Sequence, residues 1–99
     1  MSLDETLLKL NTLKDSLQEF DENDLSELSG INPIEMYKFQ EWWVSLSELQ
    51  KLDLIQKINR IAEENFELEF YEILYFTLRD ESPDIRKESL NGLWECEDY

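Results

Sequence analysis

The residue types that carry most enzyme chemistry are missing from this chain. The sequence contains no histidine, which removes Ser-His and Cys-His nucleophile pairs, histidine-containing zinc sites and the commonest general base. The single cysteine, Cys96, is too few for a thiolate metal site, and there is no glycine-rich phosphate loop. We therefore expect no catalytic site, no cofactor and no metal, and we interpret the chain as non-enzymatic.

Acidic side chains crowd the segment 15–27, and calcium is the metal that such a cluster would bind. The segment has no basic residue, and its carboxylates belong to Asp15, Glu19, Asp21, Glu22, Asp24 and Glu27. An EF-hand loop needs oxygen ligands at alternating positions, a central glycine and a closing glutamate. Leu25 stands where a ligand is required and Gly30 comes too late, so calcium is not expected. Asp24 and Glu27 instead have capping-box spacing for a short helical turn, which a left-handed Gly30 would end.

A formal net charge of −15 restricts the partners of the chain. Its 24 acidic residues outnumber 9 basic ones, and the densest basic group, Lys51, Lys57 and Arg60, is interrupted by Asp53. Binding to nucleic-acid phosphates or to anionic membranes needs clustered Lys and Arg, so neither is expected. The acidity favours either a well-solvated surface or a basic protein partner.

Length and composition indicate one cytoplasmic, all-α domain. With 99 residues, 41% of them hydrophobic, the chain is long enough for one modest core. Scarce glycine and proline, together with abundant Leu and Glu, are typical of helices. A single cysteine fits a reducing compartment, and the N-terminus lacks the features of a signal peptide. No apolar run reaches the roughly 18 residues of a membrane span.

Apolar residues spaced by three and four predict the helices. One such stripe covers residues 3–20 and consists of Leu3, Leu7, Leu10, Leu13, Leu17 and Phe20. In the simplest interpretation this helix packs on the rest of the domain, and in the alternative it forms the seam of a homodimer. Further helices are expected over about 32–44 and 46–65, followed by the first arm of a helical hairpin over 66–79.

Capping residues mark where the helices begin. Asn32 and Pro33 form a strong start, which Glu35 can complete as a capping box. Ser45 and Ser47 are two possible caps for the next helix. At the start of the last helix, Ser82 is expected to cap and Pro83 to be the first helical residue.

Two adjacent tryptophans lie in the helix that begins at Pro33. On a helix Trp42 and Trp43 point about 100° apart, so they serve two different contacts. Packing in the core is the favoured interpretation, and a binding hot spot for a partner is the alternative.

The clearest motif of the chain lies in the segment 74–99. Leu78, Asp80, Pro83, Ile85 and Arg86 follow the pattern L-x-D-x-x-P-x-I-R, and Ser89, Leu90 and Leu93 continue it on the second helix. This pattern resembles the core of a HEAT repeat, an armadillo-type pair of antiparallel helices with proline at the bend, over about 66–96. The wider segment 28–98, with its stretches AEENFELEF and GLWECED, resembles the N-terminal region of uncharacterised bacterial HEAT-like repeat proteins.

The resemblance implies an all-α fold, a short right-handed α-solenoid of about five helices. Residues 1–30 would form an N-terminal helix and acidic cap, 31–65 a degenerate helical pair, and 66–99 the HEAT-like hairpin. Asp80 and Arg86, with Pro83 at the bend, would form the structural ladder that joins neighbouring repeats, and would not be catalysts.

The last helix predicts contact with other protein. Since about three repeats are needed to bury a continuous core, the apolar side of 90–94 would lack a neighbour. The candidate contacts for another protein, a second copy or further repeats are Leu90, Leu93, Trp94, Trp42 and Trp43. The expected function is a protein–protein interaction scaffold, the N-terminal capping segment of a longer HEAT-repeat protein. The alternatives are an acidic DNA mimic that inhibits a basic protein, and an accessory subunit related to phycobilin-lyase HEAT proteins.

Overall fold

The chain folds into α-helices joined by short connections. The computed structural model describes residues 3–15, 20, 22–65 and 67–97, apart from the side chains of 14–15 and 94–97. These residues form six helices and no strand: α1 (Leu3–Asp15), α2 (Glu22–Ser26), α3 (Pro33–Trp43), α4 (Glu48–Glu64), α5 (Tyr71–Thr77) and α6 (Pro83–Glu97). The predicted all-α class is confirmed. The sequence predicted about five helices, and the sixth is the five-residue α2.

Capping boxes begin α3, where the sequence predicts one, and α4, where the sequence offers two possible caps. At the start of α3, the Asn32 side chain accepts from the Glu35 backbone N–H at 2.8 Å, and the Glu35 carboxylate accepts from the Asn32 N–H at 3.0 Å. For α4 the capping residue is Ser47, whose hydroxyl accepts from the Gln50 N–H at 3.2 Å. The other candidate, Ser45, instead donates its hydroxyl to the Trp42 carbonyl at 2.6 Å, at the end of α3.

Two other caps differ from the prediction. Asp24 lies inside α2, because its buried carboxylate pairs with Lys9 on α1, 3.0 Å away, and so ties α2 to the first helix. The Ser82 hydroxyl is buried and makes no hydrogen bond within the described residues, whereas the Ser82 carbonyl accepts from the Arg86 N–H at 3.0 Å. Gly30 has φ +65°, which confirms the left-handed conformation expected after the short turn.

One predicted helix is shorter in the structure, and part of another lies outside the described residues. α1 is described over Leu3–Asp15, the predicted helical positions 16–19 lie outside the described residues, and Phe20 is not helical. In the hairpin, α5 begins only at Tyr71, and the described residues before it are not helical. Phe70, which precedes α5, makes no side-chain cap.

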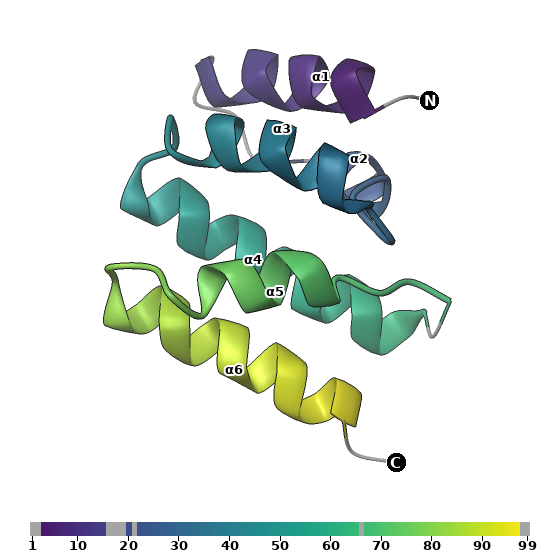
Figure 1. Cartoon of the computed structure of the whole chain (residues 1–99), viewed down its shortest axis with the longest axis vertical. Helices are drawn as coiled ribbons and strands as arrows, with labels where there is room; N and C mark the ends of the chain where they lie inside the picture. Colours follow the sequence, from purple (N-terminus) through teal and green to yellow (C-terminus); the bar gives the residue numbers. More distant parts are fainter. Residues whose placement is uncertain (1–2, 16–19, 21, 66, 98–99) are drawn as a thin grey trace.

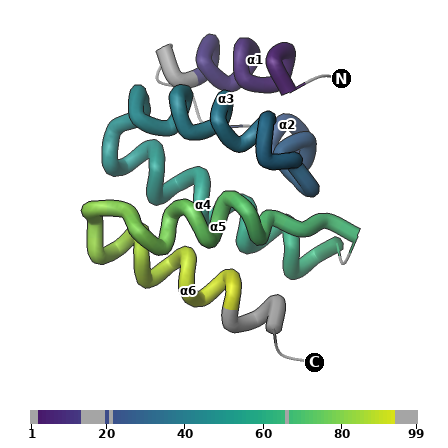
Figure 2. The backbone as a smooth tube through the Cα atoms, in the orientation of Figure 1, coloured from purple at the N-terminus to yellow at the C-terminus, as the bar shows by residue number. Residues whose placement is uncertain are grey.

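The odd-numbered helices pack in one row and the even-numbered helices in another. α1 contacts α3, while α2 contacts α4 and α4 contacts α6. Aromatic contacts join α3 to α5, since the Phe76 ring lies 6.4 Å from Phe39 and 6.2 Å from Trp43. α1 also contacts α2, and α5 contacts α6. Figures 1 and 2 show that this arrangement places α1 and α6 at opposite ends of the long axis.

An aromatic cluster fills the centre of the α3 side of the core. Phe39 is fully buried, and its ring lies 5.9 Å from Trp42 and 5.8 Å from Trp43. Trp42 continues to Phe20 at 5.8 Å in an edge-to-face contact. Because large aromatic rings bury much apolar area, this cluster joins the segment before α2, α3 and α5 into one core.

Small residues let α6 approach α4 and α5. A Cβ at Gly92 would overlap the Asn59 side-chain oxygen and lie 3.0 Å from Leu74 Cδ1. The Asn59 amide donates to the Glu88 carbonyl of α6 at 2.9 Å. The hydroxyls of Thr77 and Ser89, both fully buried, are 2.5 Å apart between α5 and α6. The hairpin is therefore packed closely against α4.

Candidate functional site

The turn between α5 and α6 is closed by local hydrogen bonds. The Asp80 carboxylate accepts from the Ser82 N–H at 3.0 Å through Oδ2. Arg86 donates to the carbonyl oxygens of Asp80 and Glu81 at 3.0 and 3.3 Å. Pro83 begins α6, where a missing N–H has no cost. Arg86 therefore bonds to the backbone of its own turn and not to the Asp80 carboxylate.

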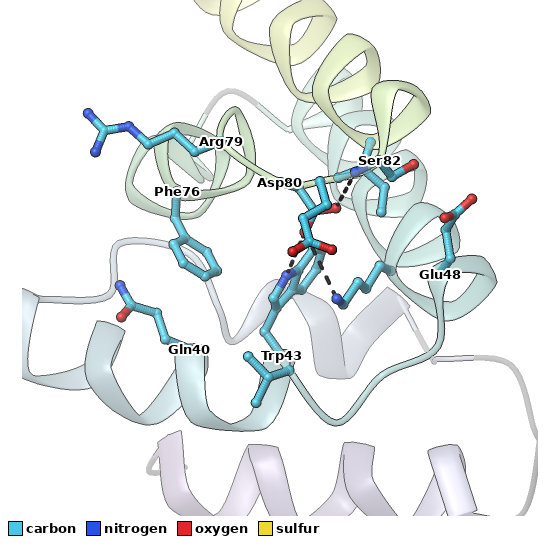
Figure 3. Close-up of a pocket in the computed structure, with 11 residues that line it drawn as sticks. Gln40, Trp43, Glu48, Phe76, Arg79, Asp80 and Ser82 are labelled. Carbon is cyan, nitrogen blue, oxygen red and sulfur yellow. Dashed lines mark hydrogen bonds and ion pairs between the residues drawn. The ribbon is translucent and has the colours of Figure 1, made fainter.

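Asp80 also reaches the preceding pair of helices. Its Oδ1 accepts from the Trp43 indole N–H of α3 at 3.2 Å and lies 4.0 Å from Lys51 Nζ of α4. Lys51 Nζ in turn lies 5.5 Å from the centre of the Trp43 ring, within cation–π range. Figure 3 shows Trp43 pointing toward Asp80, and its dashed lines join the Asp80 carboxylate to Trp43, Lys51 and Ser82. Among the predicted ladder residues, Asp80 thus bonds through its side chain to α3 and α4.

A pocket of about 570 Å³ opens beside this carboxylate, between the α3–α4 and α5–α6 connections. Trp43 and Phe76 give it aromatic walls, and Val44 lies exposed at its rim. Glu48, Glu81 and Arg79, all of them exposed, also line it. Its other lining residues are Gln40, Lys51, Asp80, Ser82 and Ile85.

A second pocket of about 390 Å³ adjoins the first and shares Gln40, Phe76 and Arg79 with it. Its further lining residues are Pro33, Met36, Tyr37, Glu72 and Tyr75. Since these residues come from α3 and from α5 and its C-terminal end, the two pockets form one surface feature along both helices. We name it the α3–α5 groove, defined by the lining residues of both pockets.

Exposed apolar side chains border the α3–α5 groove. Tyr37 on α3 is 70% exposed, Val44 just after α3 is 72% exposed and Tyr75 on α5 is 51% exposed, and Ile34 on α3 is exposed as well. The sequence analysis named only Trp42 and Trp43 of this helix as candidate contacts, and so it missed this surface. Positions 34, 37 and 44 follow helical spacing on a second face of α3, and that spacing was the available signal.

The structure places most of the predicted partner contacts in the core. Trp43 is 2% exposed and Trp42 8%, because both pack on Phe39, and Leu93 is buried in α6. Leu90 is exposed on the outer side of α6. The side chain of Trp94 lies outside the described residues. Only Leu90 of these candidates is thus described at the surface.

Outside the groove, several charged side chains form ion pairs. Asp4 pairs with Lys38 at 2.9 Å, Asp53 with Lys57 at 3.1 Å, and Glu22 with Arg60. Around the α3–α5 groove, the carboxylates of Glu48, Glu72 and Glu81 are exposed and form no ion pair with any described residue. The groove therefore combines exposed apolar side chains with uncompensated negative charge.

The described residues contain neither a candidate metal-binding cluster nor a candidate membrane-spanning helix. No three or more carboxylate or cysteine side chains gather there in a group that could hold a metal ion. No helix in the described part has the length and apolar character needed to cross a membrane.

Comparison with protein-family models, with curated proteins and with solved structures found no match for this chain.

Proposed function

We propose that the chain is a protein–protein interaction scaffold built as a short HEAT-like stack of helical hairpins. The observation that carries the proposal is the contact between helices of the same parity, α1 to α3 to α5 and α2 to α4 to α6. In a helical-repeat stack each hairpin packs mainly on its neighbours, which produces two such rows. The bonds from Asp80 to Trp43 and Lys51 support the same arrangement, because they join the last hairpin to the preceding one.

Within the row α1–α3–α5, helices α3 and α5 offer the binding surface. Stacked hairpins present side chains of successive helices side by side, and such extended surfaces bind other proteins. Tyr37 on α3 and Tyr75 on α5 both line the α3–α5 groove and are both exposed. Tyrosine is enriched among residues that dominate binding energy, since it combines apolar area with a polar group.

The alternative of a DNA mimic is less well supported. A mimic needs its carboxylates along one face, like the phosphates of a duplex. The exposed carboxylates of the described residues instead occur on five helices, for example at Asp4, Glu41, Glu63, Glu72 and Asp84. No observation favours chromophore handling of the kind expected for a relative of phycobilin lyases.

Site-specific photocrosslinking in the native host tests the proposal. A photoreactive phenylalanine analogue replaces Tyr75 in one variant and Leu8, exposed on α1, in a matched control. The expected result is a discrete crosslinked protein, identified by mass spectrometry, that also binds the purified wild-type chain. If every crosslinked protein is also captured by an unrelated acidic protein carrying the same probe, the scaffold proposal is rejected.

A further inference from the structure

We propose that the α3–α5 groove binds a basic segment of a partner protein, one that carries both Lys or Arg and apolar side chains. This inference rests on the proposed function and extends it by naming the face and the chemistry of the partner. Two independent features of the groove support it, its apolar border and its uncompensated carboxylates.

The apolar border requires an apolar counterpart. Single exposed apolar side chains are common on protein surfaces, whereas several around one groove indicate a binding site. Tyr37, Tyr75 and Val44 border the groove over most of the length of α3. Between them Phe76 and Met36 line its floor, so a segment lying in the groove would bury apolar area on both sides.

The charges of the groove select a basic segment. Glu48 and Glu81 lie at the end near the helix connections, and Glu72 lies at the other end, beside Tyr37 and Tyr75. None of the three forms an ion pair with a described residue. A chain with net charge −15 also attracts basic partners at long range. An acidic segment would meet like charge at both ends of the groove.

The groove also contains two cationic side chains, Lys51 and Arg79, and its carboxylates still favour a basic segment. Lys51 is already directed at Asp80 and the Trp43 ring, so its charge is compensated inside the protein. Arg79 lines both pockets, where one guanidinium stands against the three carboxylates of Glu48, Glu72 and Glu81, and in Figure 3 it points away from Asp80 and Trp43. A Lys or Arg stem can therefore lie against Phe76 while its charged group reaches Glu48 or Glu81.

Selection from a random-sequence peptide library displayed on phage tests the inference. The intact chain is immobilised and the net charge of enriched peptides is compared with that of the starting library. The affinity of the enriched peptides is then measured by fluorescence anisotropy at physiological salt. Measurements use wild type, the groove variant Glu48→Gln/Glu72→Gln/Glu81→Gln, and the control variant Glu27→Gln/Glu63→Gln/Glu67→Gln. Both variants remove three exposed carboxylates, so they have the same net charge.

The expected result is enrichment of basic peptides with apolar residues, which bind the groove variant roughly tenfold more weakly because three rim charges are lost. The control variant should stay close to wild type, and Tyr37→Ala should weaken binding more than Leu8→Ala. The inference is overturned if enriched peptides are neutral or acidic, if both triple variants lose affinity equally, or if no peptide is enriched. A protein crosslinked from the host that binds both triple variants equally would leave the scaffold proposal standing while rejecting the groove as its site.

Discussion

Replacing Asp80 with alanine should destabilise the fold more than any other single change of an exposed or half-buried charge in the hairpin. The carboxylate holds two buried donors, the Trp43 indole N–H at 3.2 Å and the Ser82 N–H at 3.0 Å. It also lies 4.0 Å from Lys51 Nζ. Alanine removes the acceptor and leaves the indole N–H of a side chain that is only 2% exposed without a partner.

The size of the effect follows from these contacts. A hydrogen bond to a charged group contributes about 1.5–3 kcal/mol, and an unsatisfied buried donor costs a similar amount. The pair with Lys51 adds at most about 1 kcal/mol, because it is long and partly solvated. Allowing for water that enters the space left by the carboxylate, we expect Asp80→Ala to lower the free energy of unfolding by about 2–4 kcal/mol. Domains of this size are stable by about 5–15 kcal/mol, so the loss is large.

Urea unfolding followed by tryptophan fluorescence and circular dichroism measures this loss. Asp80→Asn keeps a side-chain acceptor while removing the charge, so it should cost about 1 kcal/mol. The neighbouring Glu81→Ala is the matched control, since that carboxylate is exposed and its variant should stay within about 0.5 kcal/mol of wild type.

A double-mutant cycle with Trp43→Phe isolates the contact between the hairpins. Phenylalanine has no N–H, so Asp80→Ala should cost about 1–2 kcal/mol less in that background than in wild type. An equal cost in both backgrounds would refute the role given to the Asp80–Trp43 bond. A loss below about 0.5 kcal/mol for Asp80→Ala alone would refute the whole argument.

Three further changes test the packing and the turns by the same unfolding assay. Gly92→Ala should destabilise the fold by about 1 kcal/mol, because overlap of the new Cβ with the Asn59 side chain outweighs the gain in helix propensity. Asn91→Ala, at an exposed position of the same helix, should be neutral or stabilising. Lys57→Met should lower the free energy of unfolding by about 1–3 kcal/mol, because the buried ammonium donates at 2.9 Å to the Phe20 carbonyl. Lys87→Met, at an exposed position, is the control, and an equal loss of stability in both variants would contradict this reasoning. Gly30→Ala should lower the free energy of unfolding by about 1 kcal/mol, because residue 30 has φ +65°, and Gly30→Asn should lower it less. An alanine variant as stable as wild type would show that the backbone can leave this conformation.

Local features of the fold could be predicted well from the sequence. The Asn32 and Ser47 caps depend on residues within three positions of each other, so their geometry is set by the local chain. The left-handed Gly30 and the all-α class likewise follow from residue type and spacing. The capping predictions for Asp24 and Ser82 were wrong because tertiary structure overrides the local motif at both residues. The Asp24 carboxylate pairs with Lys9 on α1, and the Ser82 hydroxyl is buried.

The candidate site could not be predicted in the same way. The spacing within α3 marks two apolar faces, but which of them is buried depends on where α1, α5 and Phe20 pack. The helix is apolar on two faces, so both tryptophans enter the core while Tyr37 and Val44 remain exposed. The partners of the Asp80 carboxylate on α3 and α4 were likewise invisible, because 37 positions separate Asp80 from Trp43.

The central claim is that α3 and α5 lie side by side and create the groove, and nuclear Overhauser effects from the Phe76 ring test it most directly. The account predicts cross-peaks from the Phe76 ring protons to those of both Phe39 and Trp43, whose ring centres lie 6.4 and 6.2 Å away. In the Asp80→Ala variant, the Trp43 indole N–H should lose its protection from hydrogen exchange, because its acceptor is gone. The cross-peaks between Trp43 and the α5–α6 turn should persist in that variant. A folded chain in which Phe76 shows cross-peaks to neither ring would contradict the stacked arrangement and both functional proposals that rest on it.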